Sequence, residues 1–525
     1  MAGGGEIQLA QPIIQRIQSF LTGKEAAQTT IVSKSWHKAW LTLPNLDFDD
    51  TYFGVSHYPY DNSSAEDFEN HAKKTIKRYG QSNLKIESFK LCMKIDQCGR
   101  AELANKLIVK ALRFGATRLC LRLERSNSFV LPDEVFGADN LVELSLSGCR
   151  IKLDDRVVIK FRRLESLSID NNVCITVDMV SKIVSSCPSI EKLSLLHDFY
   201  HEYENGTDDD YLGEEGRRRR VDAAAARKGV ATVMPVGVVV NLIPRLRCLV
   251  LGYAWFKILC LGDLLSRFPF LKDFTLYMKQ CHVDTILEEG IQISNSSLES
   301  IKLVLKDFSN DGEVKRPRVK FDVPSVREFT FEGAVIPFLS FMSVPLSREW
   351  ESHVTIQCID HDGFCFSTIW FNELSELLTK LSQSKTHLSL NARGITDSFD
   401  YKVADKIIQG LPKHELENLT IDISGLPSLS CYALFDGLFR LCRPKLITHY
   451  YKDVPDKRRY GDSDMEKTNI DILCQTLEEG INFKVSSPTQ FMYGLNDLGE
   501  VNAQAFDMDC VPVTPRFFDY KVSRP

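Results

Sequence analysis

A short apolar pattern recurs along most of the chain, and it constrains the fold more than any other feature. From about residue 85 the pattern apolar-x-x-apolar-x-apolar is clearest as LVELSLSGC from Leu141, LESLSIDNN from Leu164 and IEKLSLLHD from Ile190. Further blocks begin at Ile86, Ala116, Leu246, Leu271, Leu298, Val326 and Leu416, with weaker ones near Glu351, Lys385 and Arg443. Successive starts from Ile86 to Ile190 are 30, 25, 23 and 26 residues apart. One strand and one returning helix occupy a length of this size.

Such a period predicts a stack of similar turns and hence an α/β fold. The apolar positions of each turn point inward and pack on the equivalent positions of neighbouring turns, because no single turn can bury its own apolar face. The alternate residues of each strand then share the opposite, open face. An ordinary parallel α/β sheet is the other fold that the pattern leaves open.

The open-face positions are mixed in charge and rich in small polar groups, which suits a protein or peptide ligand better than nucleic acid. The formal net charge of -6, from 64 basic and 70 acidic residues, also disfavours general nucleic-acid binding. For any one of these positions, solvated strand surface is a more common role than a contact. The candidate substrate-binding residues are Arg118, Arg122, Glu143, Ser166, Asp170, Asp273, Tyr277, Glu328 and Asn418.

The first fifty residues carry helical rather than strand spacing. An amphipathic stripe is formed by Ile13, Ile14, Ile17, Phe20 and Leu21. Pro12 suits the first turn of that helix, and a second helix over 24–31 would carry Ala27 and Ile31 on one face. Ser33 can cap a third helix that contains Trp36 and Trp40. Three short helices bury little surface among themselves, so we expect a docking face for a partner. A simple helical cap on the following fold is the alternative.

The same stretch resembles a plant-type F-box, in which a Leu-Pro opening and paired aliphatic residues precede Ile-x-Ser-Phe-Leu and then Val-Ser-Lys-x-Trp with a second Trp. The matching residues are Leu9, Ile13, Ile14, Ile17, Ser19, Phe20, Leu21, Lys24, Ala27, Val32, Ser33, Lys34, Trp36 and Trp40. Ala10 departs from the pattern, because it stands where the family has proline, and the nearest proline is Pro12. The resemblance implies binding to the Skp adaptor, which links F-box proteins to a cullin and a RING subunit. The residues implied at that interface are Leu9, Pro12, Ile13, Ile14, Ile17, Leu21, Val32, Ser33 and Trp36.

The repeated blocks resemble leucine-rich repeats, and an F-box followed by repeats is the order found in plant F-box/leucine-rich-repeat proteins. Cys149 and Asn172 match the Cys or Asn with which that family satisfies loop backbone groups. The resemblance implies a three-helix F-box over 1–50 and a horseshoe of about twelve irregular repeats over 85–450. A helical connector over 51–84 and a cap with an irregular tail over 451–525 complete the expected organisation.

By the same resemblance, the chain would be a non-catalytic subunit that recognises a protein substrate for a Skp-cullin-F-box ubiquitin ligase. The alternative is a leucine-rich-repeat interaction scaffold whose F-box no longer functions. No nucleotide-binding or nucleophile-elbow fingerprint appears in the sequence, so we predict no catalytic residue, cofactor or metal. His197 and His201, with Glu202 and Glu204 nearby, could place two imidazoles on one helical face, but their order differs from the HExxH motif.

Residues 201–240 are expected to form a mobile surface insertion, because acidic residues, a basic run and several alanines follow one another there. The basic run, Arg217–Arg220, could be a nuclear-import signal or an anion site, or solvated surface balanced by its acidic neighbours.

The scattered cysteines, with no CxxC pair, are typical of reduced thiols inside cells. No secretory signal is evident at the amino terminus, and the apolar run 231–243 is shorter than the roughly 20 residues of a membrane helix. We therefore expect a soluble protein of the nucleus, the cytoplasm or both.

Overall fold

The computed structural model divides into two compact units, Met1–Lys257 and Ile258–Pro525, which are described separately. The described residues are 9–54, 62–95, 98–124, 129–154, 156–170, 173–196, 243–252, 261–279, 290–306, 316–343, 345, 349–358, 368–392, 410–422, 428–451, 484–485, 489–491 and 516–523. None of the described helices is both long enough and apolar enough to cross a membrane. Asn172, the His197–His201 pair and the predicted insertion 201–240 lie outside the described residues.

The first unit begins with short helices whose starts follow local capping rules. Helix α1 (Gln11–Gln18) has proline in its first turn. Helix α2 (Gly23–Gln28) starts with a capping box between Thr22 and Glu25, and the 3-10 turn η1 (Thr29–Ile31) follows it. At α3 (Lys34–Leu41), the Ser33 hydroxyl accepts a hydrogen bond from the Trp36 backbone N–H, as its capping role predicts.

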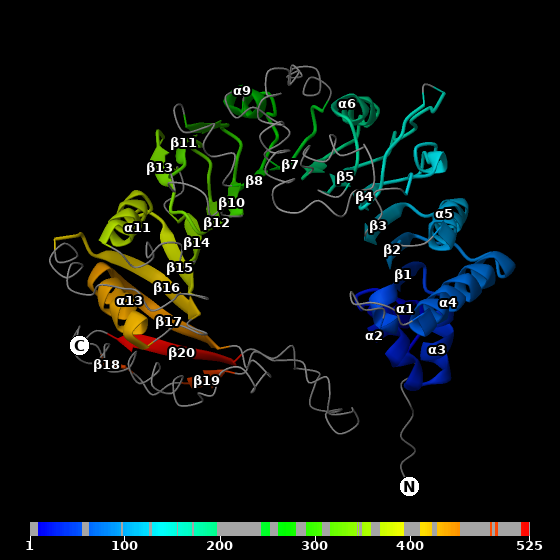
Figure 1. The fold of residues 1–525 in the computed structure, drawn as a ribbon, viewed down its shortest axis with the longest axis horizontal. Coiled ribbons are helices and arrows are strands. Elements are labelled where there is room, and N and C mark those ends of the chain that lie inside the picture. The colour runs from blue at the N-terminus through cyan, green and yellow to red at the C-terminus, as the bar shows by residue number, and fades with distance from the viewer. Residues whose placement is uncertain are drawn as a thin grey trace, which may run out of the picture. The chain divides into compact units, whose positions relative to one another are not determined.

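A parallel sheet makes up the rest of the first unit. Its strands are β1 (Asn45–Asp49), β2 (Ser88–Lys94), β3 (Arg118–Glu124), β4 (Glu143–Ser147), β5 (Ser166–Ile169), β6 (Lys192–Leu195) and β7 (Cys248–Gly252), each hydrogen-bonded to the next. The connections include η2 (Asp50–Phe53), α4 (Asn62–Gln81), α5 (Cys98–Arg113), η3 (Asp133–Val135) and α6 (Val177–Ser185). Figure 1 shows α5 and α6 on one side of the strands. Alternate strand residues such as Leu119, Leu144 and Leu167 are buried.

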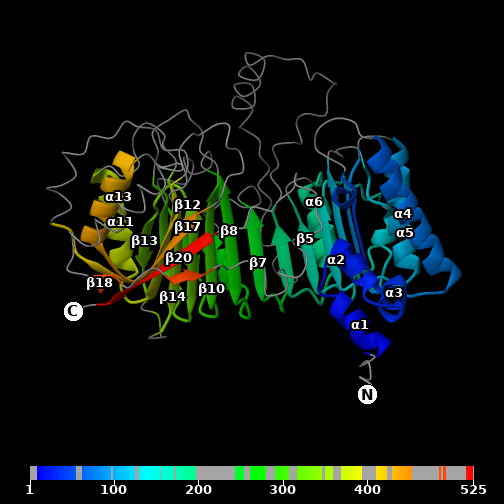
Figure 2. The same cartoon turned by 90° about the horizontal axis from the view of Figure 1, so that it is seen from below.

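The second unit has the same parallel pairing. Its ladder consists of β8 (Asp273–Lys279), β10 (Ser300–Lys306), β12 (Glu328–Gly333), β14 (Glu351–Gln357), β15 (Lys385–Asn391), β16 (His414–Asp422) and β17 (Cys442–Tyr451). Figure 2 shows the parallel strands of each unit side by side with their arrows pointing the same way. The helices of this unit are α9 (Leu261–Ser266), α11 (Thr368–Lys380) and α13 (Ser428–Leu441). Strand β20 (Arg516–Ser523) joins β17 in antiparallel pairing, and the short β18 (Lys484–Val485) and β19 (Thr489–Phe491) pair with β20.

Each predicted repeat block becomes a strand that begins within two residues of the expected position, from β2 to β17. The expected α/β class with parallel strands is therefore confirmed. Two features differ from the sequence-based expectation. The first is that the sheet begins with β1 at Asn45 rather than near residue 85. Leu46 and Phe48 of this strand are buried and alternate with half-buried residues, although the repeat pattern in the sequence does not extend to them.

The second difference is a separate three-stranded parallel sheet in the second unit, formed by β9 (Ile291–Ser294), β11 (Arg318–Asp322) and β13 (Phe338–Phe341). These strands lie between β8, β10, β12 and β14 in the sequence, where the repeat pattern predicts returning helices. Val319 and Phe321 are buried and alternate with exposed residues, a two-residue period that favours a strand over a helix.

Candidate functional site

Exposed apolar side chains gather on the amino-terminal helices. Among the described residues, eleven large apolar side chains are exposed, and six of these lie between residues 9 and 32. They are Leu9, Ile13, Ile17, Phe20, Ile31 and Val32, and we call them the N-terminal apolar face. The helices that carry them form one small bundle, because α3 packs against both α1 and η1. Such a concentration is typical of a protein-interaction surface, whereas single exposed apolar residues are ordinary.

Glutamine side chains supply polar contacts between the helices of this bundle. Gln18 is completely buried, and its amide nitrogen donates to the Thr29 hydroxyl at 2.8 Å and to the Trp36 carbonyl at 3.2 Å. Gln15 likewise donates to the carbonyl and the hydroxyl of Thr42, at 3.0 and 2.9 Å. These hydrogen bonds join α1 to η1, to α3 and to the residue that follows α3.

The bundle is attached to the parallel sheet through Asp47 of β1. Its carboxylate accepts hydrogen bonds from the Gly23 backbone N–H at 3.1 Å and from the Tyr52 hydroxyl at 3.2 Å. It also pairs with Lys90 of β2, at 3.2 Å. Gly23 is required by this close approach, because an added Cβ would lie 2.7 Å from the Asp47 carbonyl oxygen.

The attachment also includes a buried ion pair and a buried tyrosine. Asp50 accepts hydrogen bonds from Arg100 of α5 and from the Lys94 backbone N–H, both at 2.9 Å. Tyr79 of α4 donates a hydrogen bond to the Leu43 carbonyl, and burial raises the pKa of its phenol to about 12. These polar contacts link the amino-terminal segment directly to the first turns of the sheet.

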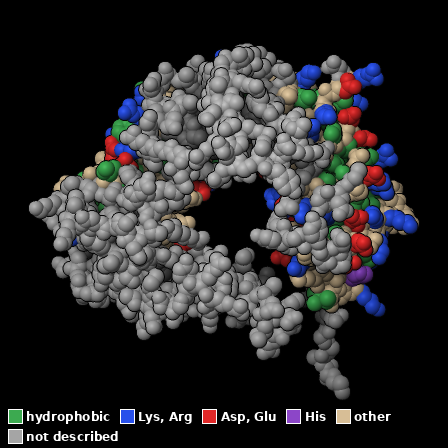
Figure 3. Space-filling model, viewed as in Figure 1, with side chains coloured by type: hydrophobic (Ala, Val, Ile, Leu, Met, Phe, Trp, Pro, Cys, Tyr) green, Lys and Arg blue, Asp and Glu red, His purple; other side chains and the backbone are tan. Residues whose placement is uncertain are grey.

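The open face of the first unit contains five of the candidate substrate-binding residues. Arg118, Glu143 and Ser166 lie in register on three neighbouring strands, where Arg118 and Glu143 are exposed and Ser166 is half-buried. Arg122 is exposed further along β3, and Asp170 follows the end of β5. Both signs of charge are therefore present on this face, a mixture that is consistent with a polar protein ligand. Figure 3 shows that basic and acidic side chains are also interspersed on the side of the unit that it presents.

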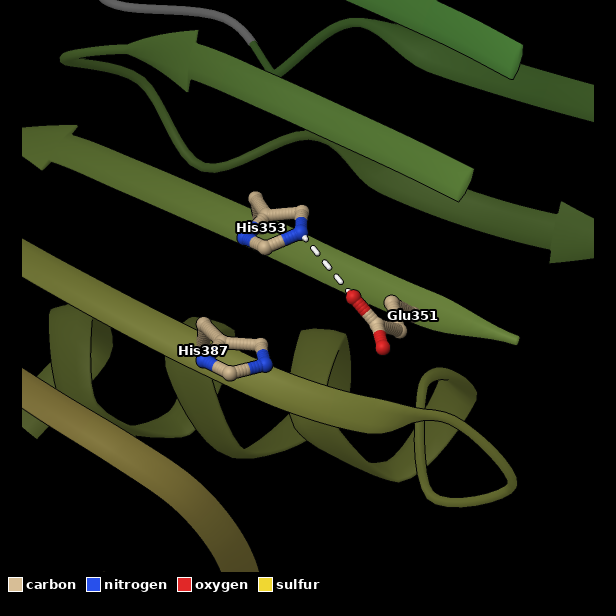
Figure 4. A group of neighbouring side chains, drawn as sticks. All are labelled: Glu351, His353 and His387. Atoms are coloured by element: carbon tan, nitrogen blue, oxygen red, sulfur yellow. Dashed lines mark ion pairs between the residues drawn. The ribbon is translucent and has the colours of Figure 1, made fainter. Parts of the chain in front are cut away.

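The second unit carries the other four candidates on the equivalent face. Asp273 and Glu328 are exposed, whereas Tyr277 and Asn418 are half-buried. Between their strands lies a cluster that sequence reasoning missed, formed by Glu351, His353 and His387 (Figure 4).

The two histidines of this cluster face each other across β14 and β15. His353 and His387 are register partners, with ring centroids 4.7 Å apart and ring planes at 16°. Burial, followed by the neighbouring His353, lowers the pKa of His387. The repeat blocks that contain these residues are the weak ones, and only the strand register brings the side chains together.

Several thiols are placed where they are poor nucleophiles. Burial raises the pKa of Cys92, Cys149 and Cys187 to about 12 in each case, so these groups are protonated at neutral pH. A thioester-forming cysteine needs the thiolate, which an environment of this kind disfavours.

Comparison with known proteins finds relatives of part of the chain. No protein-family model matches the chain. The F-box/LRR-repeat proteins At3g59210 and At3g59200 of Arabidopsis thaliana are 31% and 30% identical to it, over 196 and 199 residues. These alignments cover 36% of this chain and 38% and 36% of the two relatives. A third, At4g14103 of the same plant, is 29% identical over 194 residues, which are 36% of this chain and 48% of that protein. This chain is a homologue of plant F-box/LRR-repeat proteins. The aligned part of the chain spans less than half the length of these relatives.

The residues that resemble an F-box do not all occupy the same environment. Leu9, Pro12, Ile13, Ile17, Val32 and Ser33 are exposed, Leu21 and Trp36 are half-buried, and Ile14 is fully buried. Six of the nine expected adaptor-binding residues are thus accessible to a partner. Ile14 can act only as support from beneath the surface.

Sequence reasoning missed the most exposed member of the apolar face of this F-box/LRR-repeat homologue. Ile31 is 86% exposed, although helical spacing placed it with Ala27 on one face of a single helix. The helix ends at Gln28 instead, and the 3-10 turn that follows directs Ile31 outward, while Ala26 takes the buried position. The tighter winding of a 3-10 turn changes which residues share a face.

Proposed function

We propose that this chain is the substrate-recognition subunit of a Skp-cullin-F-box ubiquitin ligase, and that its N-terminal apolar face binds the Skp adaptor. The observation that carries the proposal is the concentration of exposed apolar side chains in the segment that resembles an F-box. Homology to plant F-box/LRR-repeat proteins supports the same role.

The energetics of such a face favour binding. Fully burying one large aliphatic or aromatic side chain contributes about 1.5–3 kcal/mol. Phe20, Ile31 and Val32 are 73%, 86% and 64% exposed, so an adaptor that covers them gains most of that contribution at each position. A few such side chains commonly dominate the binding energy of a protein interface.

The open faces of the parallel strands are the proposed substrate-binding surface. Their polar side chains project from hydrogen-bonded strands, so the surface is preorganised for a protein ligand. In this mechanism the chain performs no covalent step itself. It raises the effective concentration of the bound substrate near a ubiquitin-charged conjugating enzyme, which accelerates transfer. The nucleus or the cytoplasm is the proposed compartment.

A matched pair of substitutions tests adaptor binding. Val32 and Val158 are 64% and 67% exposed, but only Val32 belongs to the N-terminal apolar face. We expect wild type and Val158→Asp to copurify with a co-expressed plant Skp adaptor, and Val32→Asp to lose that association. Both substitutions should leave the melting temperature unchanged, because neither side chain is buried.

The result also separates the proposed ligase subunit from a leucine-rich-repeat scaffold. Ala10 is the feature that favours the scaffold, because it stands where the F-box pattern has proline. If wild type fails to bind the adaptor under conditions in which an established F-box protein binds, the scaffold is the better description. Adaptor-dependent ubiquitination of a captured partner would instead support the ligase.

A further inference from the structure

A metal-binding geometry is present on the open face of the second unit, formed by three side chains that are not among the candidate substrate-binding residues. The ligand atoms of Glu351, His353 and His387 all lie within 4.8 Å of one another. The Glu351 Oε2 atom is 3.7 Å from the His353 Nε2 atom. Figure 4 shows the carboxylate and both imidazoles on the same side of two neighbouring strands. We propose that these three side chains bind a divalent transition-metal ion, with zinc as the expected occupant.

The strand register produces this arrangement. His353 and His387 are direct partners in the parallel pairing of β14 with β15, and paired strands lie about 4.8 Å apart. Glu351 precedes His353 by two residues, so strand alternation places both on one face. On the other face Ser352, Val354 and Leu388 are buried at 0–1% exposure. The backbone below the cluster is therefore held by a packed core.

The distances between the three ligand atoms suit a tetrahedrally coordinated ion after small side-chain rotations. Nitrogen and oxygen ligands lie about 2.0–2.2 Å from zinc, which places neighbouring ligand atoms about 3.3–3.6 Å apart in a tetrahedron. The 3.7 Å separation within the Glu351–His353 pair is already close to that value. His353 and His387 are half-buried and Glu351 is exposed, so the side chains have room to move the remaining distance.

The type of ligand selects the type of metal. Two imidazoles and one carboxylate favour zinc and its neighbours in the first transition series, whereas magnesium and calcium prefer sites made of oxygen. Three protein ligands also leave a fourth position open. On an open face that position is accessible to water or to a donor atom of a bound protein.

The residues around the cluster are compatible with a cation. The register neighbours on the outer strands are Glu328 beside Glu351, Thr330 beside His353 and Asn418 beside His387, and all of them carry oxygen acceptors. Lys385, the register partner of Glu351, pairs its ammonium group with Glu349 at 3.5 Å.

The test is a metal titration of the purified full-length chain after treatment with a chelator. Isothermal calorimetry with ZnCl₂ should give one tight site in wild type. Substitution of either histidine, His353→Gln or His387→Gln, should weaken that site at least tenfold, and Glu351→Gln should weaken it by a smaller factor. His37→Gln is the matched control, because His37 is exposed on α3 in the other unit and should leave binding unchanged. Added zinc should raise the melting temperature of wild type and of His37→Gln but not of His387→Gln.

Cobalt substitution identifies the ligands independently. A nitrogen and oxygen site should give weak visible absorption from Co²⁺ without the intense near-ultraviolet band of cobalt–thiolate bonds. A thiolate band would assign the metal to cysteines and overturn the proposal. Zinc affinity unchanged in both histidine variants would also overturn it, as would absence of binding in wild type. Equal melting temperatures of the metal-free variants and wild type would exclude misfolding. None of these outcomes depends on adaptor binding, so the proposed metal site and the proposed ligase function are tested independently.

Discussion

Replacement of Arg100 by methionine would remove one half of the ion pair that joins the amino-terminal segment to α5. Both side chains of the Asp50–Arg100 pair are only 5% exposed, and their atoms are 2.9 Å apart. Arg100 also lies over the Phe68 ring, 5.9 Å from its centroid. Methionine preserves much of the apolar stem but leaves the Asp50 carboxylate buried without its positive partner, although the Lys94 backbone N–H still donates to it at 2.9 Å. Breaking a buried pair in this way costs about 3–5 kcal/mol.

Hydrogen exchange is the suitable measurement, because a chain of two units is not expected to unfold in a single step. Arg100→Met should lower the free energy of opening at the amides of β1 and β2, which corresponds to exchange roughly a hundred to several thousand times faster. Lys73→Met is the matched control. The Lys73–Glu69 pair is just as short, at 2.8 Å, but its side chains are 56% and 25% exposed. Its loss should cost at most about 0.5 kcal/mol.

A double variant distinguishes charge from packing. Asp50→Leu combined with Arg100→Met removes both charges together, so it should recover most of the stability lost in the single variant. If Arg100→Met is no more harmful than Lys73→Met, the ion pair does not join these segments. If the double variant is as unstable as the single one, loss of packing rather than an unpaired charge is the cause.

Two further substitutions test other parts of the fold. Glu373 of α11 is buried 3.3 Å from Arg316, and burial raises its pKa from the ordinary 4.5 to about 7. The folded state therefore holds this proton more tightly than the unfolded state, and the associated stability is complete below pH 4.5 and is lost as the pH rises through about 7. Glu373→Gln should reduce the fall in melting temperature between pH 5.5 and pH 8, and an unchanged fall would contradict the assignment. Gly148 has φ +71°, and an added Cβ would lie 1.5 Å from the Leu123 carbonyl oxygen. Gly148→Ala should therefore destabilise the β3–β4 region by about 2 kcal/mol or more, measured by hydrogen exchange at the amides of these strands, whereas Gly99→Ala, which meets no atom within 4 Å, should not.

Much of the secondary structure follows from local signals in the sequence. The two-residue alternation of blocks such as LVELSLSGC predicts the strands, because alternate side chains point to opposite faces wherever a strand lies. Pro12 and Ser33 mark helix starts for equally local reasons, since each acts on backbone groups within one turn. The resemblance to an F-box also comes from contiguous residues, and homology to F-box/LRR-repeat proteins agrees with it.

The tertiary structure decided which of these residues are accessible and which distant ones meet. Helical spacing alone cannot separate Ile13, which is 51% exposed, from Ile14, which is fully buried, because burial depends on the neighbouring helices. The buried Gln18 is equally unexpected, since the partners of its amide nitrogen, Thr29 and Trp36, lie on other segments of the chain. His353 and His387 are 34 residues apart, and Asp50 and Arg100 are 50 apart. Their meeting depends on which strands pair and in what register, a choice made by the packing of the whole sheet rather than by any local pattern.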